Sequence, residues 1–199
     1  MIDEEWNDNA FPLAYLITFR TYASWLHGDK RGSIDMHGKN VFGTPFNPPN
    51  LGLKAKMQNS LNHGVVLLNE QQREAVKKAI EEVCEQRKHY LQAVNIRSNH
   101  VHAVVSAQVN PERLVDSFKA FATKKLRESF LTEKDAKIWS RGRSRRYLWQ
   151  PRHVALAIEY VLFGQGDNPF SLESEESETR TLVERVLSRY RTRLLRARF

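Results

Sequence analysis

Two histidines one residue apart are the clearest candidates for chemistry in this sequence. His100 and His102 flank Val101 within a run of strand-forming residues. Side chains alternate between the two faces of a strand, so both imidazoles point to one face and Val101 points to the other. Neutral imidazole is a good ligand for first-row divalent metals. Because the apolar run 103–105 indicates a buried strand, where unpartnered imidazoles would cost stability, the pair predicts half of a metal site.

A second group of residues combines positive charge with aromatic rings. Such a mixture pairs with phosphates and stacks on unpaired bases, so it predicts a binding surface for single-stranded or hairpin DNA. For any single member, a solvated basic surface is an equally good interpretation. The residues that we expect to contact DNA are Trp139, Arg141, Arg143, Arg145 and Arg146 in one segment and Lys124 and Lys125 in another.

These residues must be positioned by strands and helices, which the hydrophobic pattern locates. Aromatic and β-branched residues predict a strand over 13–22, and a further pair of strands over 90–96 and 100–107, separated by the turn-forming residues 97–99. Apolar residues at three- and four-residue steps predict a helix from the capping residue Asn69 to about His89 and another that begins at Pro111.

Two more elements complete the pattern. The segment 138–150 predicts a short final strand that follows a positively charged loop, and 154–165 predicts a helix that ends near Gly164. The order is then strand, helix, hairpin, helix and strand. This order predicts an α+β fold with a ferredoxin-like antiparallel sheet and helices on one face, followed by the helix 154–165.

The chain divides into one domain and an appendage. We expect residues 1–170 to form the domain, interrupted by an insertion at 23–68 whose prolines forbid a long helix, and 171–199 to form an acidic linker and a basic C-terminal helix. That helix could bind DNA, pack on the domain or pair with another subunit. The insertion could contact the substrate or could be an insertion only.

Composition narrows the choice of partner and compartment. The net charge of +8 and the isoelectric point near 9.7 favour a polyanion, with nucleic acid ahead of anionic membrane, although charge for solubility alone is the alternative. The single cysteine, Cys84, excludes a disulfide within the chain and fits a reducing compartment. The acidic N-terminus and the lack of a long apolar run predict a cytoplasmic protein that does not enter a membrane.

One string of residues resembles a known signature. The run Ser98-Asn99-His100-Val101-His102-Ala103-Val104-Val105 resembles the histidine-hydrophobe-histidine motif of the HUH endonucleases, in their single-tyrosine branch of IS200-like and REP-associated tyrosine transposases. The run Trp139-Ser140-Arg141-Gly142 also resembles a phrase of these transposases. The similarity covers roughly 13–166, and its order of elements is similar to the fold of that family.

The resemblance implies roles for residues that the pattern alone does not assign. It implies that Tyr160, on the helix after the last strand, is the nucleophile, and that His100 and His102 bind a divalent metal, Mg²⁺ or Mn²⁺. A phenol attacks poorly on its own, and a metal that polarises the scissile phosphate would help it. Related enzymes often place a polar ligand one turn after the tyrosine, where this chain has Gly164. We expect Gln165 as the third ligand, with Asp167 and His153 as weaker candidates.

Three functions remain open at the level of sequence. The resemblance implies a transposase-type endonuclease that nicks and rejoins single-stranded or hairpin DNA through a 5′-phosphotyrosine, acting as a homodimer with a site built within one chain or between two. A replication-initiator nickase of the same chemistry is usually larger than 199 residues. A DNA-binding protein that has lost cleavage is the third possibility.

Overall fold

The computed structural model describes residues 11–30, 32 and 47–164. The elements of this part of the chain are β1 (Ala14–Thr21), α1 (Leu51–Asn59), α2 (Glu70–Gln86), β2 (Tyr90–Ile96), β3 (His100–Ser106), α3 (Pro111–Glu128), β4 (Trp139–Leu148) and α4 (Pro151–Leu162). Apart from α1, this is the order that the sequence predicts.

The four strands form one antiparallel sheet in the order β2-β3-β1-β4. The first and third strands lie together in the centre, and the two strands that follow α2 and α3 directly lie at the edges. This arrangement confirms the predicted ferredoxin-like sheet. Since β3 is a central strand, its histidines have a strand on each side of them.

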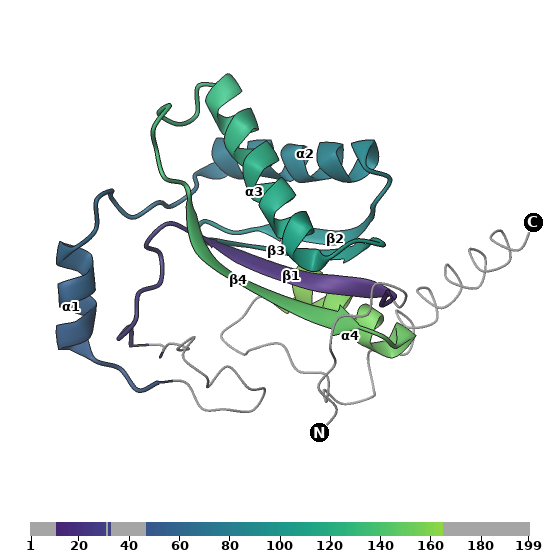
Figure 1. Ribbon diagram of the computed structural model, residues 1–199, viewed down its shortest axis with the longest axis horizontal. Coiled ribbons are helices and arrows are strands. Elements are labelled where there is room, and N and C mark those ends of the chain that lie inside the picture. Colours follow the sequence, from purple (N-terminus) through teal and green to yellow (C-terminus); the bar gives the residue numbers. More distant parts are fainter. Residues whose placement is uncertain (1–10, 31, 33–46, 165–199) are drawn as a thin grey trace, which may run out of the picture.

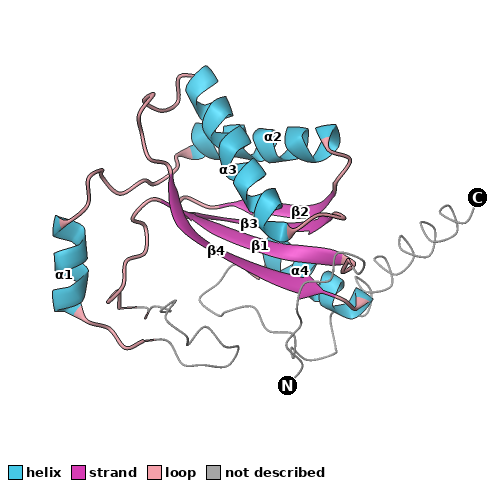
Figure 2. Ribbon diagram, in the orientation of Figure 1, coloured by secondary structure: helices cyan, strands magenta, loops and turns pink. Residues whose placement is uncertain are grey.

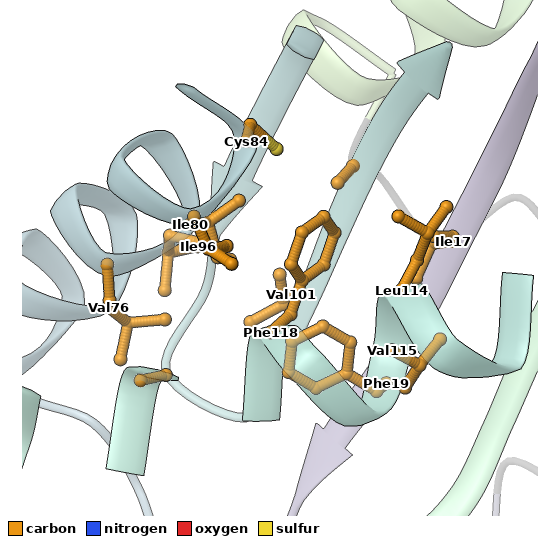
Figure 3. Packing of buried hydrophobic residues seen from close by; sticks show 14 of the residues in the cluster. Ile17, Phe19, Val76, Ile80, Cys84, Ile96, Val101, Leu114, Val115 and Phe118 are labelled. Atoms are coloured by element: carbon orange, nitrogen blue, oxygen red, sulfur yellow. The ribbon is translucent and has the colours of Figure 1, made fainter. Parts of the chain in front are cut away.

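The two faces of the sheet carry different helices. In Figures 1 and 2, α2 and α3 lie on one face and α4 lies on the opposite face. The odd-numbered residues of β1 and β3 pack against α2 and α3, as Figure 3 shows for Ile17, Phe19 and Val101 with Ile80 and Phe118. The even-numbered residues of the same strands point to α4. Each strand therefore supplies both a core and the opposite surface.

Side-chain caps define where two helices begin. Asn69 accepts a hydrogen bond from the backbone N–H of Gln72, whose own side chain accepts one from the N–H of Asn69. This capping box satisfies two helix-terminal donors at α2. Asn110 caps α3 in a similar way, and Pro111 occupies the first helical position, where its missing N–H costs nothing.

The last two elements differ from the sequence prediction in extent. The basic run that we expected in a loop belongs to β4, which pairs with β1 from Leu148 back to Trp139. Its arginines are compatible with a strand because β4 is an edge strand with exposed positions. The following helix begins at Pro151, three residues earlier than expected, since proline is tolerated in a first turn.

The described part of the insertion contains a helix that the sequence analysis missed. The nine-residue α1 is capped by Asn50 and buries none of its side chains, so it has no amphipathic pattern to detect. In Figure 1 it stands apart from the sheet. Gly28 faces the start of α1, and a β-carbon there would lie 2.2 Å from the carbonyl oxygen of Asn50, so only glycine fits. The predicted C-terminal helix and its linker lie outside the described residues.

Within the described ranges, every helix is too short or too polar to cross a bilayer.

Phe118 tests the core between the sheet and its two long helices. Its side chain is fully buried, and truncation to alanine would leave a cavity. We expect Phe118→Ala to lower the free energy of unfolding by about 3–5 kcal/mol, measured by urea denaturation. Phe130, which is 93% exposed, is the matched control, and Phe130→Ala should change stability by less than about 0.5 kcal/mol. Equal effects of the two changes would contradict this description of the core.

Candidate active site

The sheet face that carries α4 is divided into an apolar and a polar part. α4 packs on the apolar part, formed by Ala14, Leu16, Ala93, Val104 and Leu148. Two residues further along the strands, on the same face, the register aligns polar residues from all four strands: Asn95, His102, Thr18 and Ser144. Because the helix covers the apolar part, the polar row lies beside α4.

The two histidines lie next to each other on this polar part. Their ring centroids are 4.7 Å apart and the rings are nearly perpendicular, at 81°. His102 is only 7% exposed, whereas His100 is half-buried at the start of β3. As strand alternation predicts, Val101 between them points into the core on the opposite face. The backbone of a central strand therefore fixes the spacing of the two imidazoles.

Hydrogen bonds to Nδ1 orient both rings. His100 Nδ1 lies 2.7 Å from Oδ1 of Asn99, and His102 Nδ1 lies 2.7 Å from the hydroxyl of Thr18. An amide oxygen only accepts, so Nδ1 of His100 donates and the lone pair of that ring is on Nε2. Thr18 can accept a hydrogen bond from the Nδ1–H of His102 in the same tautomer. Such contacts to the second ring nitrogen are the usual means of orienting metal-binding histidines.

His102 is held in the neutral form that binds metal. Burial lowers its pKa from 6.5 to about 3, and the positive charges of His100, Arg20 and Arg97 act in the same direction. At neutral pH the ring is therefore uncharged, with a lone pair available to a cation.

His100 and His102 could occupy two coordination positions of one first-row divalent metal. Two imidazoles suit Mn²⁺ better than Mg²⁺, because Mg²⁺ prefers oxygen ligands. Within residues 11–30, 32 and 47–164, the side chains of His, Cys, Asp and Glu do not gather in a group of three that could hold a metal. Gln165 and Asp167, the expected candidates for a further ligand, lie outside the described residues. His153 lies in the first turn of α4, about 10 Å along the helix from Tyr160.

The last turn of α4 brings Tyr160 against the histidines. Its ring centroid is 5.4 Å from that of His102, with the planes at 83°. The side-chain amide of Asn95 donates to the carbonyl oxygen of Val161 at 2.9 Å, which ties this turn to β2. Gly164 then closes the helix, and its N–H donates to the carbonyl oxygen of Tyr160 at 3.0 Å. The tyrosine is therefore held from the strand side and from the helix end.

Two opposed effects act on the pKa of the Tyr160 phenol. Burial raises the pKa of the phenol above its ordinary value of 10.0, and the guanidinium of Arg146 lowers it in part. Arg146 comes from β4 and pairs with Leu16 on β1, next to the polar row. It can therefore stabilise negative charge that develops on the tyrosine oxygen or on a phosphate.

The other residues that the sequence predicts to bind DNA do not lie together in the structure. Arg146 is on the histidine face of β4, and strand alternation puts Arg143 and Arg145 on the opposite face. There these two arginines form ion pairs with Glu112 and Asp116 of α3. They are not brought together with the histidines. The sequence predicted these arginines in a loop, whereas in β4 their side chains alternate between the two faces of the sheet.

The remaining candidates also lie away from the histidines. Trp139 packs on the core edge-to-face with Phe19, and its indole N–H donates to Thr123 at 3.0 Å. Lys124 and Lys125 are on α3, where they pair with Glu128 and Glu82 respectively. Arg141 lies exposed in the first half of β4.

Several residues of the site were not found from the sequence. Thr18 and Arg20 occupy the even positions of β1, and Asn95 and Arg97 occupy the matching positions on and after β2. Polar residues on alternate positions of otherwise apolar strands are a signal that could have indicated them. Their neighbours in space could not be known without the register between the strands.

The low pKa of His102 predicts a dependence of stability on pH. In the unfolded chain this histidine takes up a proton below pH 6.5, whereas in the folded protein it does so only near pH 3. Neutral His102 therefore contributes its full share of the unfolding free energy above pH 6.5, and this contribution is lost as the pH falls from 6.5 towards 3. In EDTA, the loss of unfolding free energy between pH 7 and pH 4 should be smaller in His102→Gln than in the unchanged protein, by about 3 kcal/mol. Parallel pH profiles would contradict a buried neutral His102.

Comparison with known proteins assigns the chain to a family. The family model described as "Transposase IS200 like" matches residues 60–161, just over half of the chain, which include both histidines and Tyr160. No curated protein sequence matches the chain.

Two solved structures align with most of the chain. One is a chain assigned as a transposase in Deinococcus radiodurans R1, with 11% identity and a TM-score of 0.42 over 73% of this chain and 85% of that one. The other is a REP-associated tyrosine transposase bound to a REP hairpin, with 11% identity and a TM-score of 0.40 over 89% of this chain and 93% of that one. On the family match, which spans the sheet from β2 onward together with α2, α3 and most of α4, the chain belongs to the IS200-like transposases.

Proposed function

We propose that this transposase is a single-strand DNA endonuclease and strand transferase that uses Tyr160 as its nucleophile and a divalent metal held by His100 and His102. The observation that carries the proposal is the run of contacts between the three rings, 4.7 Å from His100 to His102 and 5.4 Å from His102 to Tyr160. A nucleophile beside a pair of groups that could hold a metal is an arrangement suited to attack on a phosphodiester.

The proposed reaction conserves the energy of the broken bond. The Tyr160 phenol releases its proton to water, its oxygen forms a bond to phosphorus, and the bond from phosphorus to the 3′ oxygen breaks. The 3′ oxygen leaves and takes up a proton from water, so protons balance. The product is a 5′-phosphotyrosine, which a 3′ hydroxyl can later attack to rejoin strands. A bound metal would polarise the phosphate, and we propose Mn²⁺ or Mg²⁺ for this role.

The protein supplies the alignment and charge for this reaction. Asn99 and Thr18 hold the histidine rings, and Asn95 holds the turn that carries Tyr160. Arg146 offsets the effect of burial on the phenol and so favours loss of its proton. Such groups, fixed in place before the substrate arrives, lower the barrier without reorganisation. We propose Gln165 as the third ligand.

The substrate that we propose is single-stranded or hairpin DNA. We also propose that the protein acts as a homodimer and in the cytoplasm. The contact of Tyr160 with His102 lies within one chain, which supports an active site built in cis. Near the C-terminal end of β4, Tyr147 and the 42% exposed Trp149 form a stacked pair with planes 11° apart. The exposed ring of Trp149 can stack with an unpaired base.

DNA binding without cleavage is the second candidate function. The observation that favours it is the raised pKa of Tyr160, because a phenol that keeps its proton is a poor nucleophile. The same assay distinguishes the two functions, because only the enzyme forms a covalent product.

The replacement Tyr160→Phe tests the nucleophile. With end-labelled hairpin DNA and Mn²⁺ or Mg²⁺, we expect the unchanged protein to form a covalent adduct on a denaturing gel and Tyr160→Phe to form none. Tyr147 is the matched control, because it packs against Tyr15 on the opposite face of the sheet, so Tyr147→Phe should retain the adduct. An adduct in Tyr160→Phe would show that the nucleophile lies elsewhere. Binding without an adduct in the unchanged protein would favour the second candidate.

Gly164 tests how closely Tyr160 must be held. A β-carbon at Gly164 would lie 3.0 Å from the Cα of Tyr160 and 3.2 Å from its ring, so one of them must shift by a few tenths of an ångström. We expect Gly164→Ala to slow adduct formation by up to about tenfold with little change in melting temperature, because catalysis is sensitive to small misplacements.

The control is Gly142→Ala, where an added β-carbon meets no described atom within 4 Å. A rate in Gly164→Ala equal to that of this control would show that the packing of Gly164 on Tyr160 has no role in the reaction.

A further inference from the structure

We propose that Arg20, stacked on Trp25, binds a backbone phosphate of the DNA strand beside His100, at the other end of the site from Arg146. The inference rests on the proposed function, since it concerns the strand that crosses the same site. The proposed phosphate-binding position consists of Arg20 on β1 and Trp25 in the segment that follows β1.

The position of Arg20 follows from the register of the sheet. Along β1, Leu16 pairs with Arg146, Thr18 pairs with His102, and Arg20 pairs with His100. These three positions of β1 share one face. Leu16 and Arg20 are four residues apart, about 13 Å along the strand, with the row of His102 between them and His100 directly opposite Arg20. This separation exceeds the rise of about 3.4 Å per nucleotide in one strand of a duplex, so the two arginines would meet different phosphates.

Trp25 fixes the orientation of the Arg20 guanidinium. The Cζ atom of Arg20 lies 3.6 Å from the centroid of the indole ring, and the indole N–H donates to the carbonyl oxygen of Gly32 at 2.7 Å. Stacking uses the flat face of a guanidinium, whereas its N–H donors project from the edge in the plane. A stacked arginine is thus ordered before it binds, which lowers the entropy lost on contact with a phosphate.

A second arginine carries positive charge to the same place. Arg97 follows Asn95 by two residues, which puts it on the histidine side, in the turn between β2 and β3. The carbonyl oxygen of Asn99 in this turn accepts hydrogen bonds from the N–H and hydroxyl of Thr21 and from the hydroxyl of Ser24, at 3.0–3.1 Å. The turn is therefore tied to the chain segment that carries Trp25.

Both arginines carry their positive charge close to the histidines. Arg20 lies directly across from His100, and Arg97 lies in the turn that leads into His100. A polyanionic strand laid across His100 and His102 would therefore be attracted on this side as well as at Arg146. A purely structural alternative is that Arg20 only holds Trp25 and its loop in place.

Binding measurements in a Tyr160→Phe background separate these alternatives, because that background removes cleavage. Fluorescence anisotropy with labelled oligothymidylate, over a range of salt concentrations, gives both the dissociation constant and the salt dependence. We expect Arg20→Gln to raise the dissociation constant about five- to tenfold and to reduce the salt slope by about 0.7, the value for one phosphate contact on a single strand. Arg20→Lys should keep the slope while it weakens binding less.

Two further variants test the stack and the specificity of the effect. Trp25→Ala should weaken binding, whereas Trp25→Phe, which keeps a ring under the guanidinium, should weaken it less. Arg87 is the matched control, because it also lies over an aromatic ring, that of Phe121 on α3, away from the histidines. Arg87→Gln should leave both the dissociation constant and the slope unchanged.

The outcomes distinguish this inference from the proposed function. An unchanged salt slope in Arg20→Gln would overturn the phosphate site. If the melting temperature of this variant also fell, the role of Arg20 would be to hold the loop that carries Trp25. Adduct formation by the unchanged protein would then still support the proposed reaction. A reduced slope in Arg20→Gln, together with no adduct in the unchanged protein, would support the phosphate site and reject cleavage. Failure of the background protein to bind the oligonucleotide at all would overturn the site.

Discussion

The two-residue alternation of the central strands is the constraint on which this structure depends. On β3, Val101, Ala103 and Val105 point into the core under α2 and α3, and His100 and His102 point to the other side. The apolar contacts that hold the strand in place therefore also fix the imidazoles. A shift of register by one residue would bury the histidines in the core and expose the valines, so folding and site geometry are selected together.

The same division operates along the length of the sheet. The face opposite the main core is apolar where α4 packs and polar where the histidines lie, so the helix stops at the boundary between the two. Tyr160 sits at that boundary, partly packed on the apolar part and in contact with His102. A side chain in this position is shielded enough to be ordered, and it stays close enough to the polar part to take part in its chemistry.

Electrostatics then set the state of the groups that meet there. Burial and the surrounding positive charges keep His102 neutral, and burial raises the pKa of Tyr160 against the opposing effect of Arg146. The basic residues on the other face are used differently, because Arg143 is paired with Glu112 and Asp116. Net charge alone does not distinguish arginines that can meet a phosphate from those that brace a helix against a strand.

The sequence by itself determined the order of the elements, the ferredoxin-like sheet, the shared face of His100 and His102, and the helix that carries Tyr160. These features follow from local periodicity and capping, which a chain carries in its neighbouring residues. Helix α1 escaped prediction because it buries nothing and so has no periodic pattern.

Only the tertiary structure decided which side chains surround the histidines. Thr18 reaches His102 across 84 positions of sequence, and Arg146 reaches the same face through the pairing of β4 with β1. Register between strands depends on packing and pairing over the whole sheet, and no local pattern states it. For the same reason, the separation of Arg143 from Arg146 appeared only when β4 was seen to be a strand, whose neighbouring side chains must point to opposite faces.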